Sequence, residues 1–170
     1  MLQFALRQAD AIQFGEFTLT SGKKSNVYIE KFRIFECGTS MNIFAQALGH
    51  EIEVDGIQAI VGMVTGGMLV AAELSREIHV SKRIYLEGKG DDMHIARQKK
   101  IDPGLRVLIV DDILTTGGTL ARAARVMEAA GAVVVGYGVL IDRSEEPHGL
   151  SPLFSALRLD VKQLAEMKPE

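Results

Sequence analysis

The segment from Arg106 to Leu120, RVLIVDDILTTGGTL, constrains the fold more than any other part of the chain. Its residues Val107 to Val110 are apolar and mostly β-branched, which is typical of a strand buried on both faces of a parallel sheet. Two aspartates, Asp111 and Asp112, follow this strand directly. Charge at the carboxyl end of a buried strand is costly unless something there uses it, and this edge of an open α/β sheet is where ligands bind. The segment therefore predicts a strand that ends in a binding site.

Hydroxyl side chains and glycines follow the two aspartates and lead into a predicted helix. They are Thr115, Thr116, Gly117, Gly118 and Thr119. Such a loop at a helix start offers free backbone N–H groups and the positive end of the helix dipole, which together favour a phosphate. The neighbouring carboxylates can accept hydrogen bonds from a vicinal diol or hold a divalent cation through water. The segment therefore predicts a ligand with a phosphate on one side and ribose hydroxyls on the other, the alternative being a simple strand end and helix cap.

Strands and helices alternate from about residue 39 to residue 142. The predicted strands are 59–64, 83–86, 107–110 and 133–141, and the predicted helices start near Thr39 or Ser40, after Gly67 and at Leu120. This alternation is typical of βαβ units, which form a parallel sheet with right-handed crossovers. The expected fold class is therefore α/β, a mostly parallel sheet with helices on both faces.

The ends of the chain lie outside this alternation. A helical stripe covers the first dozen residues, and two extended runs at 16–19 and 27–35 predict a small separate layer, a hood. A last strand at 154–159 and a closing helix at 161–167 are expected. The chain is thus predicted to be one domain over residues 1–170, in which 1–35 is mainly hood, 36–145 the core sheet and 146–170 a C-terminal closing segment.

Composition argues against several classes of protein. The net charge of −3 and the lack of a long basic run argue against a nucleic-acid binder. No apolar run approaches the roughly 20 residues of a membrane span. Cys37 is the only cysteine, so an intrachain disulfide is excluded. Arg7 and Asp10 interrupt the apolar pattern at the start, which is unlike a signal peptide, and the expected location is the cytoplasm.

The order of strand, acidic pair, Thr/Gly loop and helix resembles the phosphoribosyl pyrophosphate (PRPP) motif of type I phosphoribosyltransferases. The resemblance implies that Asp111 and Asp112 bind the ribose 2′- and 3′-hydroxyls and that residues 115–119 bind the 5′-phosphate. It also implies that a second strand-to-helix junction, formed by Thr65, Gly66 and Gly67, binds the pyrophosphate. Taken without its context, a Gly-Gly pair is more often a tight turn than a binding site.

The N-terminal stretch GEFTLTSGKKSNVYIEKFR (residues 15–33) resembles orotate phosphoribosyltransferases, through Phe17, Leu19, Ser21, Gly22 and Ser25, with Tyr28 at an aromatic position. The Asp142-Arg143 pair matches an Asp-Arg of that family, whose arginine grips the orotate carboxylate with two parallel hydrogen bonds. A surface salt bridge is the alternative for this pair. The resemblance implies that orotate contacts Phe17, Ser21, Gly22, Lys23, Thr115 and Arg143.

Residues 87–103, EGKGDDMHIARQKKIDP, are polar and weakly periodic, and they depart from the family's usual pattern. Many members carry Arg-Lys-x-x-Lys-x-His-Gly here, on a mobile loop that closes over PRPP from the neighbouring subunit. Thr20 also stands where the family often has a lysine. The cations that could act on the departing pyrophosphate are Lys89, His94, Arg97, Lys99 and Lys100, with Lys89 taken as the catalytic candidate. The alternative for each is a solvated surface charge.

These resemblances imply that orotate and PRPP react to give orotidine 5′-monophosphate and pyrophosphate, a step of pyrimidine nucleotide synthesis. They also imply Mg²⁺ held mainly by substrate and water without a dedicated protein site, and a homodimer. Two alternatives stay open at this point. One is a phosphoribosyltransferase for another base, and the other is a regulator that binds PRPP without catalysis.

Overall fold

A six-stranded sheet forms the centre of the molecule. The computed structural model describes residues 1–18, 24–144 and 147–159. The strands lie in the order β5-β4-β3-β6-β7-β8, and only the contact of β4 with β5 is antiparallel. Their bounds are Ala59–Met63 (β3), Lys82–Glu87 (β4), His94–Ile95 (β5), Arg106–Leu114 (β6), Val133–Asp142 (β7) and Leu153–Arg158 (β8). The predicted α/β class with a mostly parallel sheet is confirmed.

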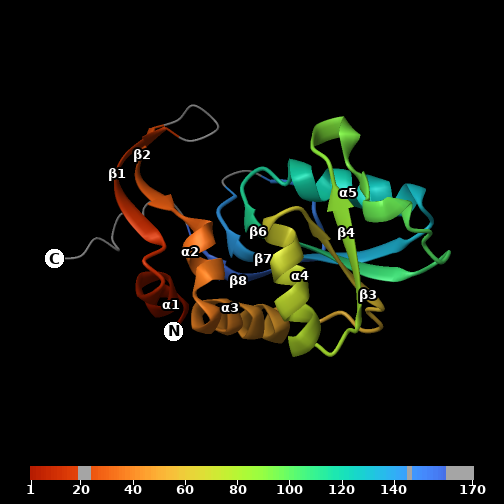
Figure 1. The fold of residues 1–170 in the computed structure, drawn as a ribbon, viewed down its shortest axis with the longest axis horizontal. Helices are drawn as coiled ribbons and strands as arrows, with labels where there is room; N and C mark the ends of the chain where they lie inside the picture. The colour runs from red at the N-terminus through yellow and green to blue at the C-terminus, as the bar shows by residue number, and fades with distance from the viewer. Residues whose placement is uncertain (19–23, 145–146, 160–170) are drawn as a thin grey trace.

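Helices cover both faces of this sheet (Figure 1). Helices α3 (Gly38–Glu51) and α4 (Gly66–Glu77) pack on one face, and α5 (Gly118–Ala129) packs on the other. Successive side chains of a strand point to opposite faces of the sheet. Ile60 and Leu108 therefore belong to the core on the side of α3 and α4 (the α3/α4 core), and Val61 and Ile109 belong to the core on the side of α5 (the α5 core). Every residue of β3 is buried, which explains its continuous apolar sequence.

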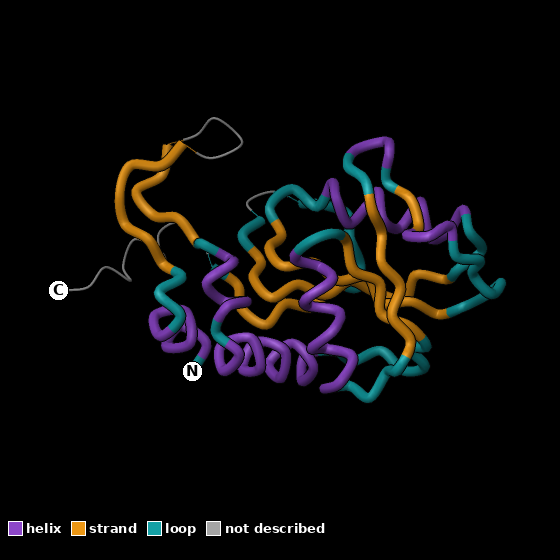
Figure 2. Tube along the Cα trace, in the orientation of Figure 1, coloured by secondary structure: helices purple, strands orange, loops and turns teal. Residues whose placement is uncertain are grey.

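The N-terminal residues form a separate two-stranded antiparallel sheet, β1 (Ile12–Thr18) with β2 (Lys24–Ile29). The trace in Figure 2 shows this hairpin projecting away from the main body. Helix α1 (Leu2–Gln8) precedes it, and its buried residues Ala5 and Leu6 belong to the α3/α4 core. The small separate layer expected from the two extended runs is therefore present.

Two boundaries near this hairpin differ from the prediction. The second extended run stops at Ile29, and residues Lys31–Glu36 form helix α2, because the Glu30 carboxylate accepts a hydrogen bond from the Phe32 N–H and caps the first turn. Helix α3 begins at Gly38, so neither Thr39 nor Ser40 is its cap. The Ser40 hydroxyl instead donates to the carbonyl of Ala5 in α1.

The N-terminal helix ends at Gln8 and not near residue 12, and β1 begins at Ile12, before the expected start at Glu16. The other predicted elements agree with the structure within a few residues, except β6 and residues 87–103. The closing helix expected at 161–167 lies outside the described residues. In the part of the chain that the structure describes, no helix has the length and apolar character needed to cross a bilayer.

Candidate active site

The connections that leave the two central strands, β3 and β6, run in opposite directions along the sheet. From β3 the chain passes through α4 to β4 on one side, and from β6 it passes through α5 to β7 on the other. Pairing between β3 and β6 ends at Gly62 opposite Val110, whereas β6 continues beside β7 as far as Leu114. Open α/β sheets bind ligands in the crevice at such a point. The two loops predicted to bind phosphates both start here.

The acidic pair lies inside β6 and not after it. The prediction ended the strand at Val110, but the backbone of Asp111 stays paired with Val139 of β7. The charges occur within a strand because β3 has already turned away, so one side of β6 is open at this height. The Asp112 N–H donates to Asp111 Oδ1 at 2.9 Å, and the Ile113 N–H donates to Asp112 Oδ1 at 2.7 Å. These bonds hold both carboxylates in place.

The first residues of α4 press against both carboxylates. A Cβ at Gly66 would overlap Asp112 Oδ2, and a Cβ at Gly67 would come within 3.4 Å of Asp111 Oδ1. A Cβ at Gly62 would overlap the Gly67 carbonyl oxygen, so glycine at position 62 lets α4 approach β3 this closely. The predicted pyrophosphate loop, Thr65–Gly67, therefore lies next to the acidic pair, and its Gly-Gly sequence allows that contact.

The Thr/Gly loop lines an open hollow together with Asp111, Ile113, Leu114 and Leu120. Gly117 has a φ of +77°, the left-handed region that favours glycine, and precedes the first residue of α5. No side chain caps α5 or α4 in the described residues. The N–H groups at both helix starts thus remain available to anions beside the same carboxylates.

Charge in the crevice is arranged around Asp112. Its Oδ2 lies 2.7 Å from Nζ of Lys31, the first residue of α2, and the Asp112 side chain is 7% exposed. Burial lowers the pKa of Lys31, but the hydrogen bond to Asp112 and the negative charges of the acidic pair raise it by more. Burial and the charge of Asp112 raise the pKa of Asp111 to about 7, against the lowering effects of the Asp112 N–H and Lys31. Asp111 therefore titrates near neutral pH.

The raised pKa of Asp111 predicts a pH-dependent stability. Asp111 has an ordinary pKa of 3.8 when unfolded and about 7 when folded, so its stabilising contribution is complete below pH 4 and is lost as the pH rises through 7. Asp111→Asn removes this loss. Between pH 4 and 8 the free energy of unfolding of the variant should gain roughly 2–4 kcal/mol relative to the unmodified protein. Urea unfolding at several pH values measures this gain, and parallel curves for the two proteins would contradict the assignment.

The residues predicted to contact orotate come from three places. The rings of Phe17 and Tyr28 lie 5.4 Å apart between the two hairpin strands, whereas Ser21, Gly22 and Lys23 lie outside the described residues. Arg143 directly follows β7, and its N–H donates to the carbonyl of Leu114 at 2.9 Å, immediately before the Thr/Gly loop. Arg143 is thereby placed beside that loop.

Asp142 acts on the turn that carries Arg143. Its side chain is buried, and its Oδ1 accepts hydrogen bonds from the N–H and the hydroxyl of Ser144 at 2.8 and 2.7 Å. Its Oδ2 lies 3.9 Å from Nε of Arg158 on β8. Asp142 is thus part of the structure that holds the turn in position.

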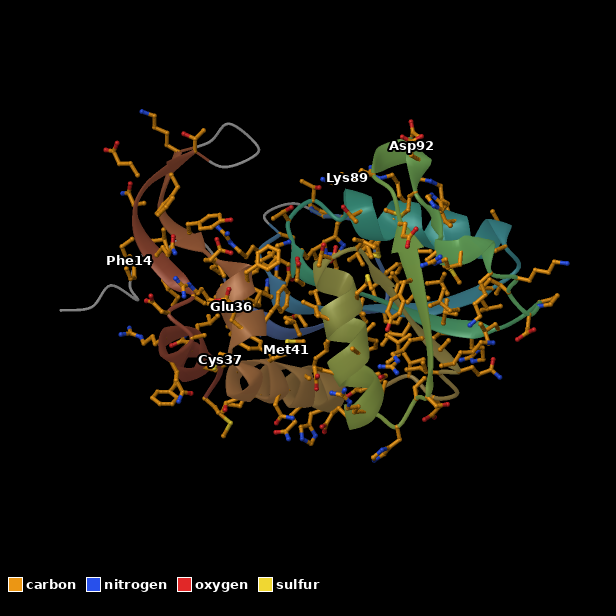
Figure 3. The ribbon with its side chains drawn as sticks, in the orientation of Figure 1. Phe14, Glu36, Cys37, Met41, Lys89 and Asp92 are labelled. Carbon is orange, nitrogen blue, oxygen red and sulfur yellow. The ribbon has the colours of Figure 1, made fainter. Side chains whose placement is uncertain are left out.

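Residues 87–103 are more regular than expected. They contain β5, which pairs with the end of β4, and two short 3₁₀ helices, Gly90–Asp92 and Ala96–Gln98. The five candidate cations of this segment are all exposed: Lys89, His94, Arg97, Lys99 and Lys100. Within the described ranges, none of them forms a hydrogen bond or ion pair with the acidic pair. Figure 3 shows Lys89 and Asp92 in the loop beyond β4.

Two cations near the site were missed by sequence reasoning. Lys31 contacts a residue that is distant in the sequence, which no local pattern indicates. The guanidinium of Arg122 lies over the first turn of α5, where a Cβ at Gly118 would come within 3.6 Å of its Nη1. The spacing of Arg122 from Gly118, four residues along a helix, is a signal that could have found it.

Comparisons with known proteins agree with this geometry. Residues 40–148 match the phosphoribosyl transferase domain family. The orotate phosphoribosyltransferase of Desulforamulus reducens is 35% identical over 86% of this chain and 76% of its own length, and that of Caldanaerobacter subterraneus is 31% identical over 90% and 80%. The crystal structure of orotate phosphoribosyltransferase from Aeropyrum pernix superimposes with a TM-score of 0.82 at 30% identity, covering 98% of this chain and 97% of that one. The chain belongs to the phosphoribosyltransferase family, within its orotate phosphoribosyltransferase group.

Proposed function

We propose that the chain transfers the phosphoribosyl group of PRPP to orotate, giving orotidine 5′-monophosphate and pyrophosphate in pyrimidine synthesis. The proposal rests on one observation: two carboxylates lie beside two helix starts that no side chain in the described part of the chain caps. A carboxylate pair suits the ribose diol, and two anion-binding helix starts suit the phosphates at the two ends of PRPP. The sequence identity to orotate phosphoribosyltransferases supports orotate as the acceptor.

In this proposal the protein works by positioning and charge, without a covalent intermediate. Asp111 and Asp112 hold the ribose hydroxyls, residues 115–119 hold the 5′-phosphate, and Thr65–Gly67 receive the pyrophosphate. The orotate nitrogen then attacks the anomeric carbon on the face opposite the leaving group, and the helix starts stabilise the negative charge that develops on pyrophosphate.

Mg²⁺ fits the donors around this crevice. The carboxylates of the acidic pair and the hydroxyls of Thr65 and Thr115 are oxygen donors, the type that Mg²⁺ prefers. The described residues contain no group of three or more His, Cys, Asp or Glu side chains able to hold a metal. We therefore assign most of the coordination to substrate oxygens and water. When bound, the ion supplies positive charge to the pyrophosphate.

The proposal assigns the orotate carboxylate to Arg143. Arg143→Ala should raise the KM for orotate at least about 10-fold while the KM for PRPP changes less than about threefold, because a two-point hydrogen bond to a carboxylate is lost. Steady-state kinetics with each substrate varied measures this difference. Arg158→Ala is the matched control, since it removes a guanidinium from the neighbouring strand that lies 3.9 Å from Asp142. Equal changes in both KM values would contradict the assignment.

The proposal also includes a homodimer located in the cytoplasm. The exposed cations of residues 87–103 make no contact with the acidic pair of their own subunit within the described ranges. In the dimer we assign these cations, with Lys89 as the catalytic candidate, to a loop that serves the partner's crevice, as the family resemblance implies. Sedimentation analysis of the purified protein measures the mass of the assembly.

A panel of bases tests the proposed substrate. Orotate, uracil, adenine, hypoxanthine and guanine are each offered with PRPP and Mg²⁺, and pyrophosphate release is followed. We expect pyrophosphate release with orotate and with none of the other four bases. If pyrophosphate is released with another base and not with orotate, that base is the acceptor. If PRPP binds but no base leads to pyrophosphate release, the protein is a regulator.

A further inference from the structure

Lys31 brings a positive charge from the N-terminal part of the chain to the acidic pair. Its Nζ lies 2.7 Å from Asp112 Oδ2, although its side chain remains 37% exposed. No sequence motif assigns a role to this residue. The contact joins the start of α2 to β6.

The backbone holds the start of α2 in a defined position. The Glu30 N–H donates to the carbonyl of Ala11 at 2.8 Å, and the Glu30 carboxylate accepts from the Phe32 N–H at 3.1 Å. Ile34 is buried in the core that also contains α3 and α4. Helix α2 ends at Glu36, which Figure 3 labels. Lys31 is therefore anchored at its Cα while its ammonium group can reorient.

The oxygen that Lys31 contacts also lies against the start of α4. A Cβ at Gly66 would overlap Asp112 Oδ2, so the ammonium group, the carboxylate and the helix start lie together. Two carboxylates at this place repel any diphosphate that binds to the α4 start, and a nearby cation offsets that repulsion. A lysine suits this task because its charge is compact and its stem flexible, so that it can exchange one anionic partner for another.

We propose that Lys31 is a PRPP-binding residue that contacts Asp112 in the free protein and moves to the diphosphate of PRPP when a ribose hydroxyl donates to Asp112. The ion pair with Asp112 keeps that carboxylate oriented before the substrate arrives. The exchange of partners then couples recognition of the ribose to recognition of the diphosphate. This inference rests on the proposed function.

Binding measurements on three ligands test the role of Lys31. Lys31→Met keeps the length of the side chain and removes its charge, and Arg33→Met removes a charge from the exposed part of the same helix. Calorimetry would measure the Kd of PRPP with Mg²⁺, of pyrophosphate with Mg²⁺ and of ribose 5-phosphate. We expect Lys31→Met to raise the first two values roughly 10- to 100-fold, as for a lost hydrogen bond to a charged group. The Kd of ribose 5-phosphate should stay within about threefold, because that ligand has no diphosphate.

A second variant and a folding control complete the design. Lys31→Arg keeps the positive charge and should recover most of the PRPP affinity, with the Tm of each variant showing that it is folded. The inference is overturned if Lys31→Met and Arg33→Met have equal PRPP affinities. It is also overturned if ribose 5-phosphate and PRPP weaken equally, since Lys31 would then act only by holding Asp112. Failure of the unmodified protein to bind PRPP would instead contradict the proposed function.

Discussion

Replacing both Asp111 and Asp112 with asparagine is expected to lower kcat/KM for PRPP at least about 100-fold while the protein remains folded. Asparagine keeps the shape of each side chain but removes the charge that strengthens hydrogen bonds from the ribose. A hydrogen bond to a charged group contributes about 1.5–3 kcal/mol, so two such losses correspond to roughly 10²- to 10⁴-fold in rate. The fold should tolerate the change, because Lys31 is partly exposed and the half-buried charge of Asp111 is removed.

Kinetics with PRPP varied, together with thermal unfolding, measures this effect. Asp102→Asn is the matched control, because Asp102 is 80% exposed and pairs with Lys82 on the surface. We expect the control to leave kcat/KM unchanged, as exposed ion pairs contribute little. A double variant that keeps kcat/KM within about threefold of the unmodified protein would refute the ribose assignment.

Gly66→Ala is expected to lower kcat/KM roughly 10- to 100-fold, because the new methyl group would occupy the position of Asp112 Oδ2. The short, buried Asp112 side chain cannot keep both its hydrogen bond from the Ile113 N–H and its ion pair with Lys31 after such a displacement. The overpacking should also lower the free energy of unfolding by about 1–3 kcal/mol. Kinetics and urea unfolding on the same preparation measure both effects.

Two comparisons separate this mechanism from general damage. Gly38→Ala is the control, since a Cβ at Gly38 meets nothing within 4 Å and the residue starts α3. If Gly66→Ala acts through Asp112, its effect on kcat/KM should be much smaller in a protein that already carries Asp112→Asn. Full additivity of the two substitutions, or a Gly66→Ala protein that behaves like Gly38→Ala, would show that Gly66 does not act on the acidic pair.

The sequence predicted the sheet and the position of the crevice because both depend on local patterns. A buried parallel strand is a continuous apolar run, as in 107–110, and a helix start that binds phosphate needs small and hydroxyl-bearing residues. The strand-to-helix order placed both loops at the same edge. Gly66 and Gly67 lie against the two aspartates, and residues 115–119 line a hollow together with Asp111.

Features that depend on distant contacts were not predictable in this way. β6 continues through two aspartates because β7 still pairs with it, and β5 consists of two residues that pair with β4. Helix α2 is a six-residue element whose start depends on the Glu30 carboxylate and on the Ala11 carbonyl. The strand partner of Asp111 is Val139, and the carbonyl that holds Glu30 belongs to Ala11, so a short sequence window around Asp111 or Glu30 does not contain these partners.

Orotate consumption in the presence of PRPP and Mg²⁺ tests the central claim most directly. The loss of orotate absorbance is followed together with the release of pyrophosphate, and the same assay is repeated without PRPP and without Mg²⁺. We predict loss of one orotate for each pyrophosphate released, and no reaction when either PRPP or Mg²⁺ is omitted. Unchanged orotate absorbance in a folded preparation that binds PRPP would contradict the account.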